Sequence, residues 1–250
     1  MVENTEDARA APDSSTAREV RISPLLGLPA LQPGDDLAGL LAKSIERAGG
    51  LLVGDVLVVA QKVVSKSEGR LAPATSQADI EELIRSEARR VRRRRDDLFI
   101  VETHQGFVCA TAGIDHSNTP DAETVILLPV NPDASAAGLS AHLGTHCGIE
   151  APPVIIADSF GRAWRTGTVD IAIGVAGMEP LIDLRGTLDW AGRELESTQV
   201  AVADELAAAA HLVMGKADGV PAALVRGAVV EHGDGSAIEL VMPPERDLFP

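Results

Sequence analysis

Aromatic side chains and positive charge are both scarce in this chain. Four phenylalanines and two tryptophans are its only aromatic residues, too few for the stacking platform on which single-stranded nucleic acid binds. Acidic residues (37) outnumber basic ones (22), and the resulting net charge of −15 repels a polyanion. We therefore expect no nucleic-acid partner.

Cysteines are few and long apolar runs are missing. Two cysteines, Cys109 and Cys147, cannot build a disulfide framework, which favours a reducing, cytoplasmic setting. No stretch approaches the roughly 18 uninterrupted apolar residues of a membrane span. The first twenty residues lack the basic and then apolar order of a secretory signal. We expect no membrane partner.

The familiar nucleotide-binding motifs are missing too. The pair Gly215-Lys216 is followed by Ala217, and position 210 is alanine, so no P-loop is present. No G-x-G-x-x-G follows a predicted strand, which excludes a Rossmann fingerprint, and no G-x-S-x-G elbow occurs. A nucleotide site in this chain would be of a less common design.

What is present predicts a folded protein of mixed class. Apolar residues make up 45% of the chain and the mean hydropathy is +0.10, values typical of globular proteins. Residues 1–19 are polar and aperiodic and are expected to form a disordered leader, with folded sequence over 20–250. Periodicity predicts helices at 37–45, 78–95, 134–146 and 198–214. It predicts strands at 20–22, 56–60, 98–102, 106–112, 125–129, 154–157, 171–175, 222–230 and 238–242. This irregular order indicates an α/β or α+β fold rather than a simple doubly wound one.

Polar clusters follow two of the apolar strands. Asp115 precedes Ser117 and Asn118, and Asp158 precedes Ser159 at the end of the run 154–157. Carboxylate and hydroxyl oxygens are ligands suited to Mg²⁺ or Mn²⁺. The competing interpretation is that both aspartates cap turns.

Three groups of basic or metal-binding residue types have two interpretations each. Lys62, Lys66 and Arg70 follow strand 56–60, where lysines bind phosphate well, although exposed lysines are common. The arginines of 89–95 fit a helix C-terminus, as a solvated face rather than an anion site. His142 and His146 beside Cys147 have zinc-like spacing, but the lack of a fourth ligand argues against a metal. Cys109 is expected to be a buried small hydrophobe.

The chain resembles the coenzyme F-420-0:gamma-glutamyl ligases of archaea and actinobacteria from about residue 27 to 227. The stretches that carry the resemblance are GLPALQPGDDLAGLL, GDVLVVAQKVVSKSEGR, IVETHQGFVCATAGIDHSN, DSFGRAWRTGTVDIAIGVAGMEPLIDLRGTLDWAGREL and VADELAAAAHLVMGKADGVP. The resemblance implies an unusual α/β fold of two intimately packed subdomains, assembled as an intertwined homodimer.

The resemblance also implies an activity. L-glutamate would be joined to the phospholactyl carboxylate of the deazaflavin coenzyme F-420-0, with further glutamates added through the gamma carboxylate. The reaction would use GTP through an acyl phosphate, with Mg²⁺ or Mn²⁺ and with K⁺. Some actinobacterial members carry a flavin-dependent reductase domain after the ligase. This chain ends near where such a domain would begin, so no FMN is expected here, and whether a reductase was removed stays open.

Site residues follow from the resemblance position by position. Asp115 and Asp158 match metal-ligand aspartates, Ser159 keeps a hydroxyl ligand, and Lys66 matches a phosphate-contacting lysine. The positions that match nucleotide contacts are Leu28, Pro29, Ala30, Leu31, Gln61, Lys62, Lys66, Asn118, Met214, Gly215, Lys216, Ala217, Asp218, Gly219, Val220 and Pro221. Archaeal members tend to have an acid where Lys216 stands, which leaves a second metal open.

Two other functions remain open at this point. One is another metal- and nucleotide-dependent phosphotransferase or phosphohydrolase that uses the same aspartates. The other is a non-catalytic nucleotide-binding subunit. The number of glutamates, the deazaflavin contacts and the preference for GTP over ATP do not follow from these residues; Arg162, Arg165, Arg185 and Arg193 are candidates for the deazaflavin's anionic groups.

Overall fold

The computed structural model describes residues 19–119 and 121–248. The leader expected over 1–19 therefore lies outside the described residues, apart from Glu19. Helices and strands alternate irregularly along the described chain, and the mixed α/β class is confirmed. Of the helices in these ranges, none combines the length and the apolar character that a membrane crossing requires.

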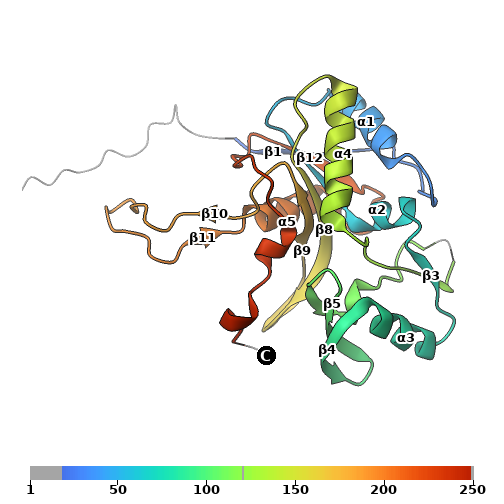
Figure 1. The fold of residues 1–250 in the computed structure, drawn as a ribbon. Coiled ribbons are helices and arrows are strands. Elements are labelled where there is room, and N and C mark those ends of the chain that lie inside the picture. The colour runs from blue at the N-terminus through green and yellow to red at the C-terminus, as the bar shows by residue number, and fades with distance from the viewer. Residues whose placement is uncertain (1–18, 120, 249–250) are drawn as a thin grey trace, which may run out of the picture.

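A five-stranded sheet forms the centre of the molecule, in the order β1-β12-β2-β8-β9 (Figure 1). Its strands are β1 (Arg21–Pro24), β12 (Ala222–Arg226), β2 (Val56–Ala60), β8 (Val154–Arg162) and β9 (Arg165–Ala176). Strands β2 and β8 are parallel, whereas the other neighbours in the sheet are antiparallel. The apolar runs 56–59 and 154–157 are almost fully buried, as expected for strands covered on both faces.

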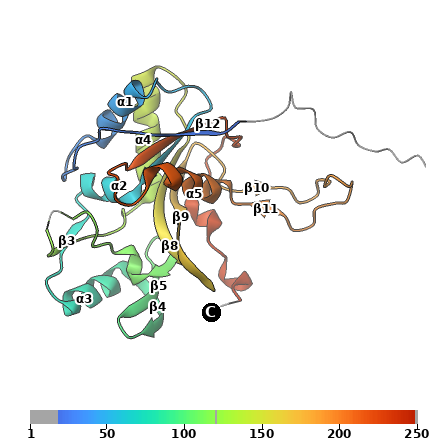
Figure 2. The same ribbon diagram turned by 180° about the vertical axis from the view of Figure 1, so that it is seen from behind.

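Helices cover both faces of this sheet. Helices α1 (Leu37–Arg47) and α4 (Pro132–Cys147) lie on one face, and α5 (Val202–Met214) lies on the other (Figures 1 and 2). Helix α2 (Gln61–Ser67) begins directly where β2 ends. Gly174 lets α4 approach β9, because a Cβ at this position would lie 2.5 Å from the Pro132 carbonyl oxygen.

Residues 71–127 form a smaller unit beside the main sheet, in the lower part of Figure 1. It contains the pair β3 (Leu71–Pro73) and β7 (Thr124–Ile126), helix α3 (Gln77–Glu87), the sheet β4 (Ala88–Arg95), β5 (Leu98–Thr103) and β6 (Val108–Ala110), and the turn η2 (Thr111–Gly113). Most of its buried apolar side chains, Phe99 and Ile84 among them, form a hydrophobic cluster separate from that of the main sheet, whereas Phe107 and Cys109 pack in the main cluster.

A narrow arm projects from the main sheet. It is built on the two-residue strands β10 (Ile182–Asp183) and β11 (Gln199–Val200), and its tip extends away from the body (Figures 1 and 2). Short 3-10 helices η3 (Ala237–Leu240) and η4 (Pro244–Arg246) follow β12 near the end of the chain.

The predicted helix 78–95 is wrong in its second half. Helix α3 ends at Glu87, and Ala88–Arg95 form strand β4. Arg90 and Arg92 bind Glu102 of the partner strand, and Arg94 lies over the Phe99 ring at 4.5 Å. These ion pairs and the cation-π contact depend on the strand pairing with β5, so they stabilise the strand rather than a helix at these residues.

Other predicted elements need correction as well. The strand expected at 238–242 is wrong, because Ser236 and Glu239 form a capping box that starts η3. Helix α5 begins at Val202 rather than 198, since Gln199 and Val200 pair with β10. Strand β8 continues through Arg162, well past 157, because β9 pairs with it along that length.

The expectation for Cys109 is confirmed. The side chain is 7% exposed within β6. Burial, followed by the negative charge of Asp158, raises the pKa of its thiol to about 12. Cys109 therefore behaves as a small apolar residue of the core.

An ion pair between a buried carboxylate and a partly exposed arginine ties β12 to the loop before β2. The Asp55 carboxylate is fully buried and accepts hydrogen bonds from Arg226 Nε and Nη2, both at 2.7 Å. It also accepts from the Leu52 amide at 2.8 Å. Removal of the guanidinium would leave a buried carboxylate without its charged partner.

We predict that Arg226→Met lowers the free energy of unfolding by about 2 kcal/mol, less than for a fully buried ion pair, because the Arg226 side chain is 38% exposed and water reaches its side of the pair. The measurement is urea unfolding at unchanged denaturant slope. Arg21→Met is the matched control, because Arg21 lies opposite Arg226 on β1 and its ion pair among the described residues is with exposed Glu19. Equal stability losses for both variants would contradict this account of Asp55.

Candidate active site

A cavity of about 470 Å³ lies where several strands of the main sheet begin or end. Strands β1 and β2 end there, β12 begins there, and Ala60 of β2 is paired with Ala157 of β8 at the same level. The segments that leave these strands therefore converge on one place. A crevice outside strand ends is where open α/β sheets bind ligands.

Most of the candidate residues from the sequence line this cavity. Those that line it are Leu28, Pro29, Ala30, Leu31, Gln61, Lys62, Lys66, Asn118, Asp158, Ser159, Met214, Gly215, Lys216, Gly219, Val220 and Pro221. Asp115, Ala217 and Asp218 do not line the cavity, but Asp115 forms an ion pair with Lys62, which does. The four arginines considered for the deazaflavin do not line it either.

The lysines of the chain are concentrated in the cavity. The chain has four lysines, and Lys62, Lys66 and Lys216 all line the cavity, while Lys43 is exposed on α1. Lys62 and Lys66 are four residues apart, on one side of α2. Burial, and then the nearby charge of Lys62, lower the pKa of Lys66. The two ammonium groups thus repel each other, and an anion between them would relieve that repulsion.

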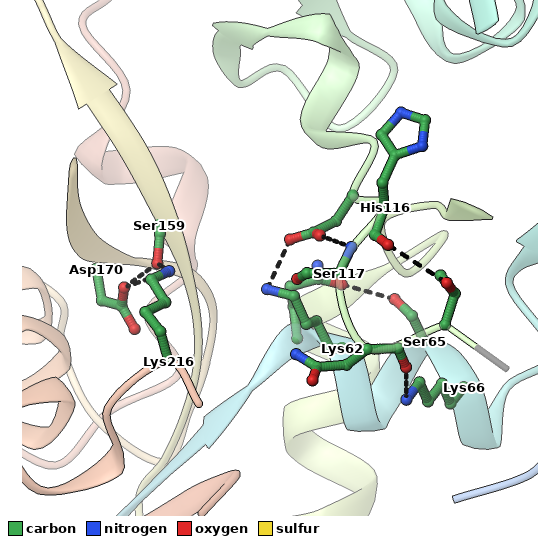
Figure 3. Close-up of polar contacts among 12 residues, drawn as sticks. Lys62, Ser65, Lys66, His116, Ser117, Ser159, Asp170 and Lys216 are labelled. Carbon is green, nitrogen blue, oxygen red and sulfur yellow. Dashed lines mark hydrogen bonds and ion pairs between the residues drawn. The ribbon is translucent and has the colours of Figure 1, made fainter. Parts of the chain in front are cut away.

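Lys62 and Lys66 are held by the loop that follows η2. Lys62 Nζ lies 2.7 Å from Asp115 Oδ2, and Lys66 Nζ donates to the Asn118 carbonyl (Figure 3). Asp115 also accepts from the Ser117 amide, and burial notwithstanding, its hydrogen bonds to Lys62 and Ser117 lower its pKa. The acid that pairs with Lys62 therefore comes from a distant part of the chain.

Asp158 is one of two buried acids that line the cavity, at 8% exposed, the other being Asp170. Burial raises the pKa of its carboxyl to about 6, and the negative charges of Asp115 and Asp170 add to this effect, against that of Lys62. The prediction that Asp158 stands at a strand end is wrong for β8 itself, which continues to Arg162. It is the neighbouring strand β2 that ends there and opens the space beside Asp158.

A second polar group lies across the cavity, on β8, β9 and α5. Asp170 accepts hydrogen bonds from the Ser159 hydroxyl, which is directly opposite in the β8–β9 pairing, and Lys216 Nζ contacts Ser159 (Figure 3). His211 Nδ1 lies 2.6 Å from Asp170 Oδ1, and Lys216 Nζ lies 3.9 Å from the same oxygen. The sequence analysis left undecided whether a second metal binds at position 216. The structure places the Lys216 ammonium group there, beside Ser159 and Asp170.

Gln61 has a donor without a partner among the described residues. Its side chain is 1% exposed, and its Oε1 accepts from the Ser65 hydroxyl at 2.8 Å. Its Nε2 is buried and makes no hydrogen bond to any described residue. A buried donor without an acceptor is unfavourable, so a ligand oxygen or nitrogen in this cavity would satisfy it.

The sequence analysis missed Asp170 and His211, which also line the cavity. Asp170 directly precedes the apolar run 171–176, whereas Asp158 directly follows the run 154–157. His211 follows Ala207 by four residues and precedes Met214 by three, both buried, so helical periodicity alone puts it on the inner face of α5. These signals were present but weak.

Comparison with known proteins gives consistent matches over this region. The profile of the family described as F420-0:Gamma-glutamyl ligase matches residues 26–227. A coenzyme F420:L-glutamate ligase from Methanothermobacter thermautotrophicus is 43% identical over 243 residues, covering 89% of this chain and 96% of the relative. One of the same name from Methanopyrus kandleri is 42% identical over 251 residues, covering 92% and 97%. A third, from Methanocaldococcus jannaschii, is 39% identical over 213 residues, covering 78% and 84%.

We predict that Asp158→Asn stabilises the ligand-free protein. Because the folded pKa of about 6 lies above the ordinary value for aspartate, the folded state takes up a proton before the unfolded state does as the pH falls. The wild type therefore loses stability as the pH rises from about 4 to about 6, and this loss persists at higher pH. At about pH 8, with a chelator present, the variant is expected to be more stable by roughly 2 kcal/mol.

Urea unfolding across this pH range measures the effect, and the advantage of the variant should fade towards about pH 4. Asp97→Asn, at an exposed turn, is the control and should show no such pH dependence. A variant no more stable than the wild type at about pH 8 would contradict the cost assigned to Asp158.

Proposed function

The chain belongs to the F420-0:gamma-glutamyl ligase family and is a ligase, and on this premise we propose that it joins L-glutamate to coenzyme F-420-0 in a GTP-dependent reaction. The relatives are named for ligation of glutamate to coenzyme F420. The proposal adds the nucleotide, the divalent cation and an acyl-phosphate intermediate. It also adds further gamma-linked glutamates.

The observation that carries the proposal is the charge arrangement of the cavity. Two ammonium groups, of Lys62 and Lys66, repel each other there, and three carboxylates, of Asp115, Asp158 and Asp170, do so as well. A nucleoside triphosphate with a divalent cation brings the opposite charge to both sets. Neutralisation of phosphate charge is what phosphoryl transfer needs, and it is needed more in a chain of net charge −15.

The donor set of the cavity fits Mg²⁺ or Mn²⁺. Asp115, Asp158 and the Ser159 hydroxyl offer hard oxygen ligands. Burial, and then the negative charges of Asp115 and Asp170, raise the pKa of Asp158, and a cation bound there would favour its charged form. Within the described ranges no three His, Cys, Asp or Glu side chains gather closely enough to hold a metal by themselves, so phosphate oxygens would complete the coordination. When bound, the cation would supply charge neutralisation and orientation.

The residues of the chain then divide the work. Lys66 and Lys62 bind the transferred phosphoryl group and hold it against the carboxylate of the deazaflavin tail. Gln61 Nε2 donates to the nucleotide, and the segments 28–31 and 214–221 enclose it. The product of this step is an acyl phosphate, and attack by the glutamate amine then forms the amide. A requirement for K⁺ belongs to the proposal, with no residue assigned to it.

We also propose that the protein is an intertwined homodimer of chains with two subdomains each. Two-stranded ribbons are marginally stable alone in water, yet the β10–β11 arm extends away from the body. Near its tip Leu188 is 62% exposed and Trp190 is 72% exposed. An arm with these apolar side chains is suited to packing on a second copy of the chain.

The activity is tested with Lys62→Met. This variant is expected to lower GTP-dependent addition of glutamate at least a hundredfold, because one of the two ammonium groups for the phosphoryl group is lost. The measurement is mass spectrometry of the deazaflavin after incubation with GTP, Mn²⁺ and L-glutamate, with GTP omitted or replaced by ATP in parallel. Asp158→Ala should abolish the same mass gain.

Lys43→Met is the matched control, since Lys43 is exposed on α1 outside the cavity, and it should retain wild-type activity. GTP hydrolysis by the wild type without any glutamyl gain would instead favour a phosphohydrolase. Absence of both reactions would favour a non-catalytic nucleotide-binding subunit.

The dimer is tested by the double variant Leu188→Glu, Trp190→Glu. Charges placed on an apolar contact oppose association, so the variant is expected to elute as a monomer in size-exclusion chromatography with light scattering. Leu248→Glu is the control, because Leu248 is 81% exposed and lies outside the arm. A double variant with the mass of the wild type would exclude the arm as the dimer contact.

A further inference from the structure

His211 and Asp170 form a polar pair that lines the cavity, and the reaction proposed above assigns this pair no part in binding phosphate. His211 is the only histidine among the described residues that line the cavity, and its Nδ1 lies 2.6 Å from Asp170 Oδ1. The two side chains come from α5 and β9, which pack against each other, and they are 26% and 8% exposed. The pair is thus built into rigid elements rather than into a loop.

The position of Asp170 fixes which nitrogen of His211 is available. A carboxylate accepts a hydrogen bond, so Nδ1 carries the proton in the neutral imidazole and Nε2 carries the lone pair. Asp170 is itself held by the Ser159 hydroxyl and faces Lys216 Nζ at 3.9 Å. A histidine oriented in this way by a carboxylate is suited to accept a proton at Nε2.

The ligation needs such an acceptor. At neutral pH the amine of L-glutamate is mostly an ammonium ion, which has no lone pair and cannot attack an acyl carbon. Lys62 and Lys66 are ammonium groups engaged with phosphate in the proposed reaction, and Asp115 and Asp158 are the proposed cation ligands. His211 is the remaining side chain of the cavity whose chemistry fits a base near neutral pH.

We propose that His211 is the catalytic base that deprotonates the amine of L-glutamate and that Asp170 is the residue that positions it. The proposal rests on the acyl phosphate proposed above. The first proton of the ammonium passes to His211 Nε2 and from there to solvent. The nitrogen lone pair then forms the C–N bond, the C–O bond to phosphate breaks with its electron pair on the phosphate oxygen, and the phosphate takes the second proton.

Hydroxylamine separates this step from the earlier one. It is a weaker base than an amino acid, is already uncharged at neutral pH, and attacks acyl phosphates to give hydroxamates without a base. We expect His211→Gln to lower glutamate addition at least a hundredfold, within the usual range for loss of a general base. GTP-dependent hydroxamate formation from the deazaflavin should stay within threefold of the wild type, on the order expected where a general base is not involved.

Two results would overturn the proposal. Glutamate addition by His211→Gln close to the wild-type rate would show that no base is needed at this position. An equal fall in glutamate addition and in hydroxamate formation would place His211 in nucleotide binding or phosphoryl transfer. His146→Gln is the matched control, because His146 lies on α4, pairs with Glu46 and is outside the cavity.

The positioning role of Asp170 is tested by comparing the activities of the single variants with that of the double variant. If it acts through His211, Asp170→Asn should lower glutamate addition while sparing hydroxamate formation, and the double variant should be no slower than His211→Gln alone. Multiplied losses in the double variant would mean that Asp170 acts independently. The wild type tests the premise separately. Failure of the wild type to form any hydroxamate with GTP and hydroxylamine would refute the acyl phosphate, and the role proposed for His211 would fall with it.

Discussion

The parallel pairing of β2 with β8 is the constraint on which the cavity depends. The two strands are in register from Leu57 and Val154 to Ala60 and Ala157. At that point β2 turns into α2 while β8 continues with β9 alone. The backbone of β8 is thereby left without a second neighbour just where Asp158 and Ser159 stand. The first residues of α2, Gln61 and Lys62, lie beside them in the space that opens.

The charged side chains of this protein have two different kinds of surroundings. On β4 the arginines are largely satisfied within the fold, by Glu102, Asp247 and Glu81 and by the face of Phe99. In the cavity, by contrast, like charges are held near one another, and the pKa of Lys66 falls while that of Asp158 rises. The first arrangement stabilises a small sheet, whereas the second costs stability that a charged ligand would return on binding. This contrast separates structural arginines from lysines suited to a ligand.

The two walls of the cavity have different chemistry. Lys62 and Lys66, with Asp115 and Asp158, make a wall suited to a phosphate and its cation. Asp170 and His211 make the other wall, and the Ser159 hydroxyl, which lies between the two walls, donates a hydrogen bond to Asp170. A reaction that first activates a carboxylate and then uses an amine needs both kinds of wall, next to each other and out of bulk water.

The sequence by itself determined the family, the mixed class and most residues of the cavity, because these rest on local order along the chain. The motifs around Lys62, Asp115 and Asp158 can be read from neighbours in sequence, and so can the buried strand 56–60. Tertiary structure decided what depends on partners far away. The arginine-rich segment became a strand because Glu102 and Phe99 of β5 pair with it. Asp170 and His211 are 41 positions apart in sequence, and the β8–β9 register and the packing of α5 bring His211 Nδ1 to 2.6 Å from Asp170 Oδ1. The periodicity of each segment by itself does not predict this contact.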